Sequence, residues 1–241
     1  MTTSSRWLVA RVVETRPATP HGRVLRLRVE GWPGNLAGQH VDVRLTAEDG
    51  YQAVRSYSLA SSGESDILEL AVDELPDGEV SPYLVEDVLP GDELEVRGPI
   101  GAYFVWTPDR AEPVQLIAGG SGIVPLVAMA RVHALTGSSA PMRMLYSVRS
   151  QDDAFYADEL TGLEGDAFVL DWAYTRSTPP GFIRPAGRVD AATIAASTIP
   201  ATEQPSVYVC GPTVFVEAVA DLLVAAGHSP DRIRTERFGG A

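Results

Sequence analysis

The first part of the chain alternates apolar and polar residues in short runs, which glycine, proline and Asp-Gly pairs separate. Alternation with a period of two is typical of strands that bury one face, and short strands at this spacing favour a small antiparallel barrel or sandwich. The glycine-punctuated stretch 97–104 predicts a bend before a last strand. We predict an antiparallel six-stranded β-barrel with strands over residues 7–14, 24–29, 41–45, 54–59, 67–72 and 93–96.

The pattern changes after the polar stretch 107–113, which prolines bracket as in many interdomain linkers. Beyond it, apolar strand segments alternate with helical segments, which indicates βαβ units and an α/β parallel-sheet domain. The predicted strands cover residues 114–118, 142–146, 168–172, 207–210 and 233–238, and the predicted helices 126–134, 155–163, 191–196 and 213–226. A length of 241 residues suits two domains. We place them at residues 1–107 and 108–241.

Composition narrows the class of protein. Hydrophobic residues make up 45% and charged residues 21%, as in globular proteins. No apolar run reaches the roughly 20 residues of a membrane helix, and we find no export signal, so we expect no membrane insertion and a cytoplasmic protein. The single cysteine, Cys210, excludes an internal disulfide and an iron–sulfur cluster held by this chain alone. The four histidines are isolated, and we predict no metal site.

Charge points away from nucleic acid as a partner. The formal net charge is −13, whereas binding to nucleic acid depends on clustered cations that neutralise phosphates. All 19 basic residues are arginine, a side chain that suits bidentate phosphate contacts. The alternative is that the use of arginine alone reflects a GC-rich genome.

One of these arginines begins the motif Arg55-Ser56-Tyr57-Ser58 on a predicted strand. Side chains at i and i+2 share a face of a strand, so Arg55 and Tyr57 are expected to point the same way. The guanidinium can hold a phosphate, and the ring can lie against a planar heterocycle. The alternative is an edge strand with a surface arginine and a half-buried tyrosine.

A second candidate phosphate site lies in Gly78-Glu79-Val80-Ser81, directly before Pro82. Serine followed by proline predicts a helix start, because serine caps free amides and proline is tolerated in the first turn. The amides and the dipole of this helix suit a phosphate, and Gly78 allows close approach of the backbone. Alternatively, Ser81 only caps its own helix.

Two further junctions join a strand to a helix in the second domain. Gly119-Gly120-Ser121-Gly122 has the glycine-rich composition of a dinucleotide phosphate loop; the alternative is that these glycines serve only tight helix–sheet packing. Cys210-Gly211-Pro212 also ends a strand, at the edge where open α/β sheets bind ligands. For Cys210 itself, the alternative is a small buried apolar residue.

In this order along the chain, the four segments resemble the ferredoxin–NADP reductase superfamily. The resemblance implies a flavin-binding barrel, a pyridine-nucleotide domain and an FAD enzyme without a fused iron–sulfur domain. Such an enzyme takes hydride from NAD(P)H and passes electrons to a separate ferredoxin or oxygenase component. Two alternatives remain open: a flavin-binding regulatory or sensor subunit without sustained turnover, and a free-flavin reductase.

The resemblance also implies roles for individual residues. Arg55 holds the flavin diphosphate, Tyr57 stacks on the isoalloxazine, Ser58 bonds near its N5, and Cys210 faces the nicotinamide. The candidate catalytic residues are Tyr57, Ser58, Cys210 and Glu236. The candidate cofactor-binding residues are Arg55, Ser56, Tyr57, Ser58, Val72, Gly78, Val80, Ser81, Gly119, Gly120, Ser121, Gly122, Arg149, Arg176, Cys210, Gly211, Pro212 and Phe238. The terminal tyrosine of plant-type relatives is absent, which makes Phe238 the candidate cover for the flavin.

Nucleotide choice depends on the residues after the second and third strands of the second domain. Arg149 and Arg176 stand there, each shortly after a hydroxyl-bearing residue, which favours the 2′-phosphate of NADPH over NADH. Asp152 and Asp153 argue against this, because an acidic side chain can bind the ribose of NADH or pair with either arginine. The alternative to a 2′-phosphate site is that both arginines are solvated surface residues.

Overall fold

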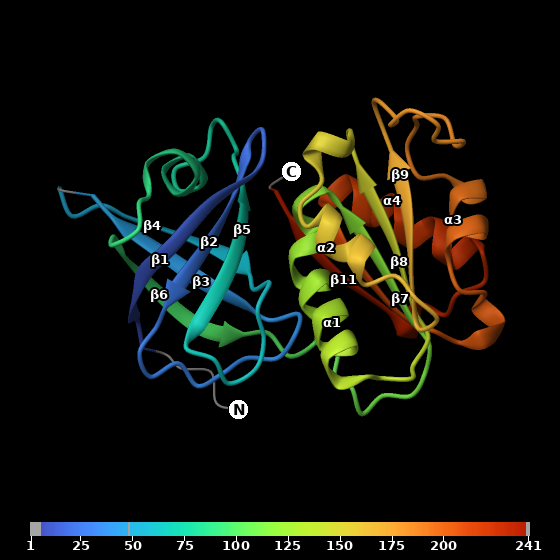
Figure 1. Ribbon diagram of the computed structural model, residues 1–241, viewed down its shortest axis with the longest axis horizontal. Coiled ribbons are helices and arrows are strands. Elements are labelled where there is room, and N and C mark those ends of the chain that lie inside the picture. Colours follow the sequence, from blue (N-terminus) through green and yellow to red (C-terminus); the bar gives the residue numbers. More distant parts are fainter. Residues whose placement is uncertain (1–5, 48, 240–241) are drawn as a thin grey trace. The chain divides into compact units, whose positions relative to one another are not determined.

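The structure is a computed structural model that describes residues 6–47 and 49–239. The chain divides into two compact units, Met1–Trp106 and Thr107–Ala241. Figure 1 shows that strands make up most of the first unit and that the second combines strands with helices.

The first unit is built on one antiparallel sheet, which confirms the predicted six-stranded fold. Its strands are β1 (Leu8–Thr19), β2 (Gly22–Arg28), β3 (His40–Thr46), β4 (Gln52–Ser58), β5 (Ile67–Asp73) and β6 (Glu93–Ile100). Their order in the sheet is β4-β3-β6-β1-β2-β5. The sheet curls so that the ends of this order meet, because the Ala60 amide, just beyond β4, donates to the carbonyl of Glu69 in β5 at 2.8 Å.

Alternating residues of these strands meet inside the curled sheet. Leu25, Leu27, Val43 and Leu70 are each 0% exposed, and they pack in one apolar core with residues of the other strands. The helical segment that begins at Ser81 and continues as the π-helix Tyr83–Asp87 adds Leu84 to this core. The core thus spans the whole unit and supports the strand that carries Arg55.

The predicted bend lies in the second half of the stretch 97–104, and the prediction of a last strand after it is wrong. Strand β6 continues to Ile100, the bend follows at Gly101 with a φ of +102°, and the described chain has no further strand before Val114. The β3–β6 pairing contains a register shift between His40 and Asp42. A bulge of this kind lets Gly98 and Pro99 remain in the strand, because the ladder does not need their hydrogen bonds there.

The second unit contains a five-stranded parallel sheet, as predicted. Its strands are β7 (Val114–Gly119), β8 (Met142–Val148), β9 (Phe168–Tyr174), β10 (Ser206–Pro212) and β11 (Ile233–Phe238). The order is β11-β10-β7-β8-β9, which places β10 and β7 side by side. The helices are α1 (Ile123–Thr136), α2 (Ala157–Gly162), α3 (Ala191–Ser197) and α4 (Thr213–Ala225), with short 3-10 helices at Gly120–Gly122, Gln151–Asp153, Ala201–Glu203 and Pro230–Arg232.

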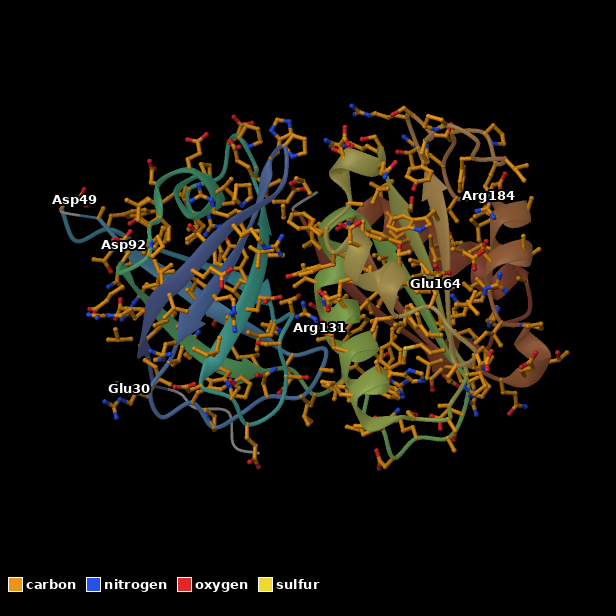
Figure 2. The ribbon with its side chains drawn as sticks, viewed as in Figure 1. Glu30, Asp49, Asp92, Arg131, Glu164 and Arg184 are labelled. Atoms are coloured by element: carbon orange, nitrogen blue, oxygen red, sulfur yellow. The ribbon has the colours of Figure 1, made fainter. Side chains whose placement is uncertain are left out.

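Helices cover both faces of this sheet (Figure 1). On one face, Ile194 of α3 and Val216 of α4 pack in a core with Ile117 of β7. On the other, α1 begins three residues earlier than predicted, because Pro125 occupies its first turn, where no amide donor is needed. Arg131 of α1, labelled in Figure 2, holds α2 through two hydrogen bonds to the Glu159 carboxylate, at 2.6 and 2.8 Å.

The helices in the described part of the chain are short. The longest helix there is α1, with 14 residues. None of the described helices is both long enough and apolar enough to cross a membrane.

Candidate functional site

Strand β4 presents Arg55 and Tyr57 on one face, as their spacing predicts. The Tyr57 ring is half-buried against the barrel core, whereas half of the Arg55 side chain is exposed. Burial raises the pKa of Tyr57 to about 12, although the Arg55 charge acts in the opposite direction. The phenol therefore stays neutral at ordinary pH, next to a permanently charged guanidinium.

Ser56 points to the other side of β4. Its hydroxyl donates to Asp42 Oδ1 on the neighbouring strand at 2.7 Å, and Arg97 Nη2 donates to Asp42 Oδ2 at 2.6 Å. Burial acts to raise the pKa of Asp42, but these hydrogen bonds and the Arg97 charge hold it below its ordinary value. The Ser56 side chain thus ties β4 to β3, and Ser58 closes the strand in a half-buried position.

The structure brings Arg55 together with the segment around Gly78, although more than twenty residues separate them. Arg55 Nη2 donates to Glu79 Oε2 at 2.6 Å, and Arg55 Nη1 donates to the Val54 carbonyl at 2.8 Å. The Tyr51 hydroxyl donates to Glu79 Oε1 at 2.9 Å. Sequence reasoning missed Glu79, and the only available signal was its place beside Gly78.

Ser81 does not cap the helix that follows it. Its hydroxyl accepts from the Leu75 amide at 3.1 Å, and the helix has no side-chain cap. A Cβ on Gly78 would lie 2.9 Å from both the Leu75 carbonyl oxygen and Ser81 Oγ, so this tight turn requires glycine. Val72 and Val80 are buried in the barrel core, which leaves mainly their backbone atoms for contact with a ligand.

In the second unit, two predicted segments meet at the carboxyl ends of neighbouring strands. A Cβ on Gly122 would lie 2.2 Å from the Cys210 carbonyl oxygen, and Cβ atoms on Gly119 and Gly211 would lie 2.6 and 2.7 Å from the Phe215 ring. Close packing of β7, β10 and α4 therefore explains these three glycines.

Gly120 differs from its neighbours. Its φ is +54°, and a Cβ there would meet no atom of the described chain within 4 Å. The packing interpretation therefore does not account for it. The backbone at Gly120 faces open space in the turn directly before helix α1. This is where a ligand phosphate can approach.

Cys210 lies near the end of β10, in register with Ala118 of β7 and Glu236 of β11. Its side chain is 1% exposed. Burial raises the pKa of this thiol well above its usual value, and the Glu236 charge acts in the same direction. Cys210 is thus a neutral thiol beside a half-buried carboxylate. Phe238, opposite Pro212 at the end of β11, is 37% exposed.

Arg149 and Arg176 come together at the same edge of the sheet. Both are exposed, and the Arg176 amide donates to the Arg149 carbonyl at 2.9 Å. Asp152 and Asp153 follow in a 3-10 helix, where Asp153 accepts a 2.5 Å hydrogen bond from the Ser150 hydroxyl. Both predicted nucleotide contacts therefore lie in one place, with acidic residues close in sequence.

Comparison with known proteins assigns a class to each unit. Residues 11–105 match the model of the oxidoreductase FAD-binding domain, and residues 116–221 match that of the oxidoreductase NAD-binding domain. The chain therefore combines a flavin domain with a nicotinamide dinucleotide domain.

This combination, together with the relatives, identifies the family: the chain belongs to the ferredoxin–NADP reductase superfamily. It is 31% identical to the ferredoxin–NAD(P)(+) reductase CarAd of Metapseudomonas resinovorans, over 95% of this chain and 68% of the relative. It is 27% identical to the reductase component of propane 2-monooxygenase from Rhodococcus jostii, over 83% of this chain and 55% of the relative. Among solved structures, the Amycolatopsis cytochrome P450 reductase superposes with a TM-score of 0.85 at 28% identity, over 99% of this chain and 71% of that one.

The matched relatives are longer than this chain. It spans between 55% and 59% of the propane 2-monooxygenase reductase component and of the toluate 1,2-dioxygenase electron transfer component of Pseudomonas putida. Membership of the family therefore does not by itself determine the reaction or the partners of the whole protein.

Proposed function

We propose that this chain is an FAD-containing NAD(P)H-dependent oxidoreductase that takes hydride from NAD(P)H and passes electrons to a separate ferredoxin or oxygenase component. The observation that carries the proposal is the pairing on β4 of an exposed guanidinium with a half-buried neutral phenol ring, in a chain with two matched cofactor domains. Relatives named as ferredoxin reductase and as monooxygenase reductase component support the choice of reaction and acceptor.

The residues of the barrel unit fit a flavin dinucleotide. Arg55 holds the diphosphate, Tyr57 supports the flavin ring, Ser58 bonds its polar edge, and the backbone of 78–81 approaches the phosphates through the turn at Gly78. When bound, FAD supplies the chemistry of accepting two electrons and releasing them singly, while the protein orients it. The barrel core behind Tyr57 keeps the supporting ring in place.

The second unit holds the nicotinamide dinucleotide in this proposal. The backbone at Gly120 receives its diphosphate, Cys210 and Glu236 contact the nicotinamide, and Arg149 and Arg176 take the 2′-phosphate of NADPH. Phe238 remains the proposed cover for the flavin. Burial and the Glu236 charge keep the Cys210 thiol neutral, so this side chain adds no second negative charge next to the nicotinamide.

Three further points complete the proposal. The domain boundary lies between residues 107 and 108, as the proline-bracketed linker indicates. The location is cytoplasmic, which a single cysteine supports because exported proteins commonly use disulfides. The acceptor binds through its own basic groups or at clustered arginines, because a chain of charge −13 repels an acidic partner elsewhere.

The test is spectroscopic and kinetic. Purified protein should be yellow or gain flavin absorbance with added FAD, and it should consume NADPH steadily with ferricyanide as acceptor. Reduction that stops after one equivalent would identify a sensor subunit instead. Complete loss of FAD on gel filtration, with added FAD acting as a substrate, would identify a free-flavin reductase. Protein that binds no flavin would refute the proposal.

A further inference from the structure

We propose that the α/β unit has a second ligand site, a cavity at the amino ends of β10 and β11 that binds inorganic phosphate through Arg232 and His228. The cavity has a volume of about 280 Å³, and three segments form it: residues from 201–205, residues 227–229 and Arg232. Two of these segments lie beyond residues 116–221, which match the oxidoreductase NAD-binding domain.

The cavity lies at the opposite edge of the sheet from the proposed dinucleotide site. Gln204 and Pro205 stand directly before β10, and Arg232 stands directly before β11. Because the two strands are parallel, these residues are at the other end from Gly211 and Phe238. Strand β10 has seven residues, so at about 3.3 Å per residue roughly 20 Å separates its two ends. A ligand of the cavity therefore does not compete with a nucleotide at the other edge.

His228 is the buried polar group of this cavity. It is 5% exposed, and its amide donates to the Leu223 carbonyl at 3.0 Å, which fixes the backbone at the end of α4. The imidazole has no hydrogen bond or ion pair with any residue in the described part of the chain, and it lines the cavity. Buried polar groups are normally hydrogen-bonded, so a partner for this ring has to come from the cavity.

Arg232 gives the cavity its charge. Its Nη1 donates to the Gln204 carbonyl at 2.7 Å, and Gln204 has a φ of +52°, which is uncommon for a residue other than glycine. This contact holds a half-buried guanidinium at the cavity wall. None of the described lining residues is acidic, although the chain has 32 acidic residues. Glu203 and Asp231, the nearest in sequence, are exposed and do not line it, so the cavity favours an anion.

The size of the cavity and the state of His228 select the anion. Pockets for drug-sized molecules begin at about 300 Å³, so this cavity suits a small ion. Burial lowers the pKa of His228, and the neutral imidazole that results offers one donor and one acceptor. The preferred ion therefore both accepts and donates hydrogen bonds.

Inorganic phosphate meets this requirement, because hydrogen phosphate keeps a proton throughout the neutral range. Sulfate has the same shape and charge without the proton, and a carboxylate only accepts. A phosphate monoester, with a second pKa near 6, has mostly lost its proton at a pH of about 7.5. Arg232 adds the planar fork of donors that suits phosphate oxygens.

The test is a phosphate titration of the whole chain at a pH of about 7.5, followed through the imidazole NMR signals of its four histidines. The signals that disappear in His228→Phe belong to His228. We expect these signals to shift and saturate with phosphate, while those of the other three histidines stay in place. Sulfate and glycerol 3-phosphate should bind about tenfold more weakly, because each lacks the proton that the ring accepts.

Two sets of variants assign the contacts by calorimetry. Arg232→Gln should bind phosphate about tenfold more weakly than Arg188→Gln, a control that removes the same charge from an exposed arginine of the same unit. His228→Phe should bind phosphate and sulfate alike. His228→Gln, whose amide still donates and accepts, should keep the preference for phosphate. Melting temperatures show which variants are folded, and Arg232→Gln decides if His228→Phe is not.

Four results would overturn the inference. Unmoved His228 signals would mean that the cavity takes up no phosphate. Equal phosphate binding by Arg232→Gln and Arg188→Gln would remove the cation from the site. Equal binding of phosphate and sulfate by the wild type would assign His228 to packing. Displacement of phosphate by saturating NADP⁺ would place the ion in the nucleotide site. A chain that binds no flavin refutes the proposed function and leaves this site unaffected.

Discussion

The ligand sites that we propose for the two units differ in the parts of the chain that form them. In the barrel unit, the proposed site consists of side chains on β4 and the backbone of 78–81, and the core lies behind them. In the α/β unit, the proposed site is the backbone at Gly120, beside junctions where Gly119, Gly122 and Gly211 leave no room for a Cβ. We therefore expect binding to be separable from folding at an exposed side chain such as Arg55 in the first unit, whereas in the second unit both depend on the same backbone junctions.

The largest effect is expected at Gly122. A Cβ in Gly122→Ala would lie 2.2 Å from the Cys210 carbonyl oxygen and 2.7 Å from the Gly211 amide nitrogen. These are backbone atoms of a central strand, so relief requires β10 and α1 to move apart. We expect the free energy of unfolding of the second unit to fall by about 3 kcal/mol or more, measured by urea denaturation.

Gly165→Ala is the matched control for this variant. A Cβ there would meet no atom within 4 Å of the described chain, and the stability should change by less than about 1 kcal/mol. If Gly122→Ala is as stable as Gly165→Ala, the close approach of the two junctions is not a requirement of the fold. The contrast between the two units would then be lost.

Much of this architecture could be predicted from the pattern of apolar residues. All the strands of both sheets lie where the alternation or the buried runs place them, because each strand repeats its face every two residues. Errors occur where local rules compete. Pro125 suggests a turn but occupies the first turn of α1, and Gly98 and Pro99 suggest a bend but lie at a register shift of β6.

The site was harder to predict than the fold. Alternation along β4 was enough to place Arg55 and Tyr57 on one face. The partner of Arg55 could not be predicted, because Glu79 reaches it only through the curl of the barrel. Gly120 and Gly122 are also required for different reasons, which only the tertiary structure reveals. Gly120 adopts a positive φ beside open space, whereas Gly122 packs against the backbone of β10.

The second prediction tests whether binding in the barrel unit is separable from folding. Arg55→Ala should weaken FAD binding by about 1.5–3 kcal/mol through the lost charge-assisted contact, and Tyr57→Ala by about 0.5–1.5 kcal/mol through the lost stacking. Arg55→Ala should leave the melting temperature nearly unchanged, whereas Tyr57→Ala should lower it, because the ring also packs against the core. FAD titration and thermal unfolding measure the two effects.

Arg26→Ala is the control for charge in this unit. Arg26 is an exposed arginine of β2 that pairs with Glu14 at 3.2 Å, so its removal changes the net charge by the same amount as Arg55→Ala. FAD binding should not respond to it. Full FAD content in both Arg55→Ala and Tyr57→Ala would show that the first ligand site is misplaced.

The third prediction concerns Cys210, where folding and function meet. We expect Cys210→Ser to slow hydride transfer from NADPH to the flavin by about tenfold, or about 1.4 kcal/mol, with flavin content unchanged. Because burial and the Glu236 charge raise the thiol pKa, the wild-type rate should show no thiol titration between about pH 6 and about pH 8. Stopped-flow measurements of flavin bleaching test both statements. An unaltered rate in Cys210→Ser would assign the side chain to packing alone.

The smallest effect is expected at the exposed arginines after β8 and β9. Their backbones are hydrogen-bonded at 2.9 Å, so both guanidinium groups can reach one 2′-phosphate. Each contact is solvent-exposed and screened, so we expect Arg149→Ala and Arg176→Ala each to lower the kcat/KM ratio of NADPH to NADH by about three- to tenfold. Arg188→Ala, which removes an exposed arginine of the chain after β9, should leave the ratio unchanged. A wild-type preference for NADH, or a ratio that none of the variants changes, would show that Arg149 and Arg176 do not bind the 2′-phosphate.

Both arginines are exposed side chains of the α/β unit. If their removal changes the NADPH to NADH ratio without lowering the stability of the unit, then nucleotide binding depends on folding only at the glycine junctions of that unit.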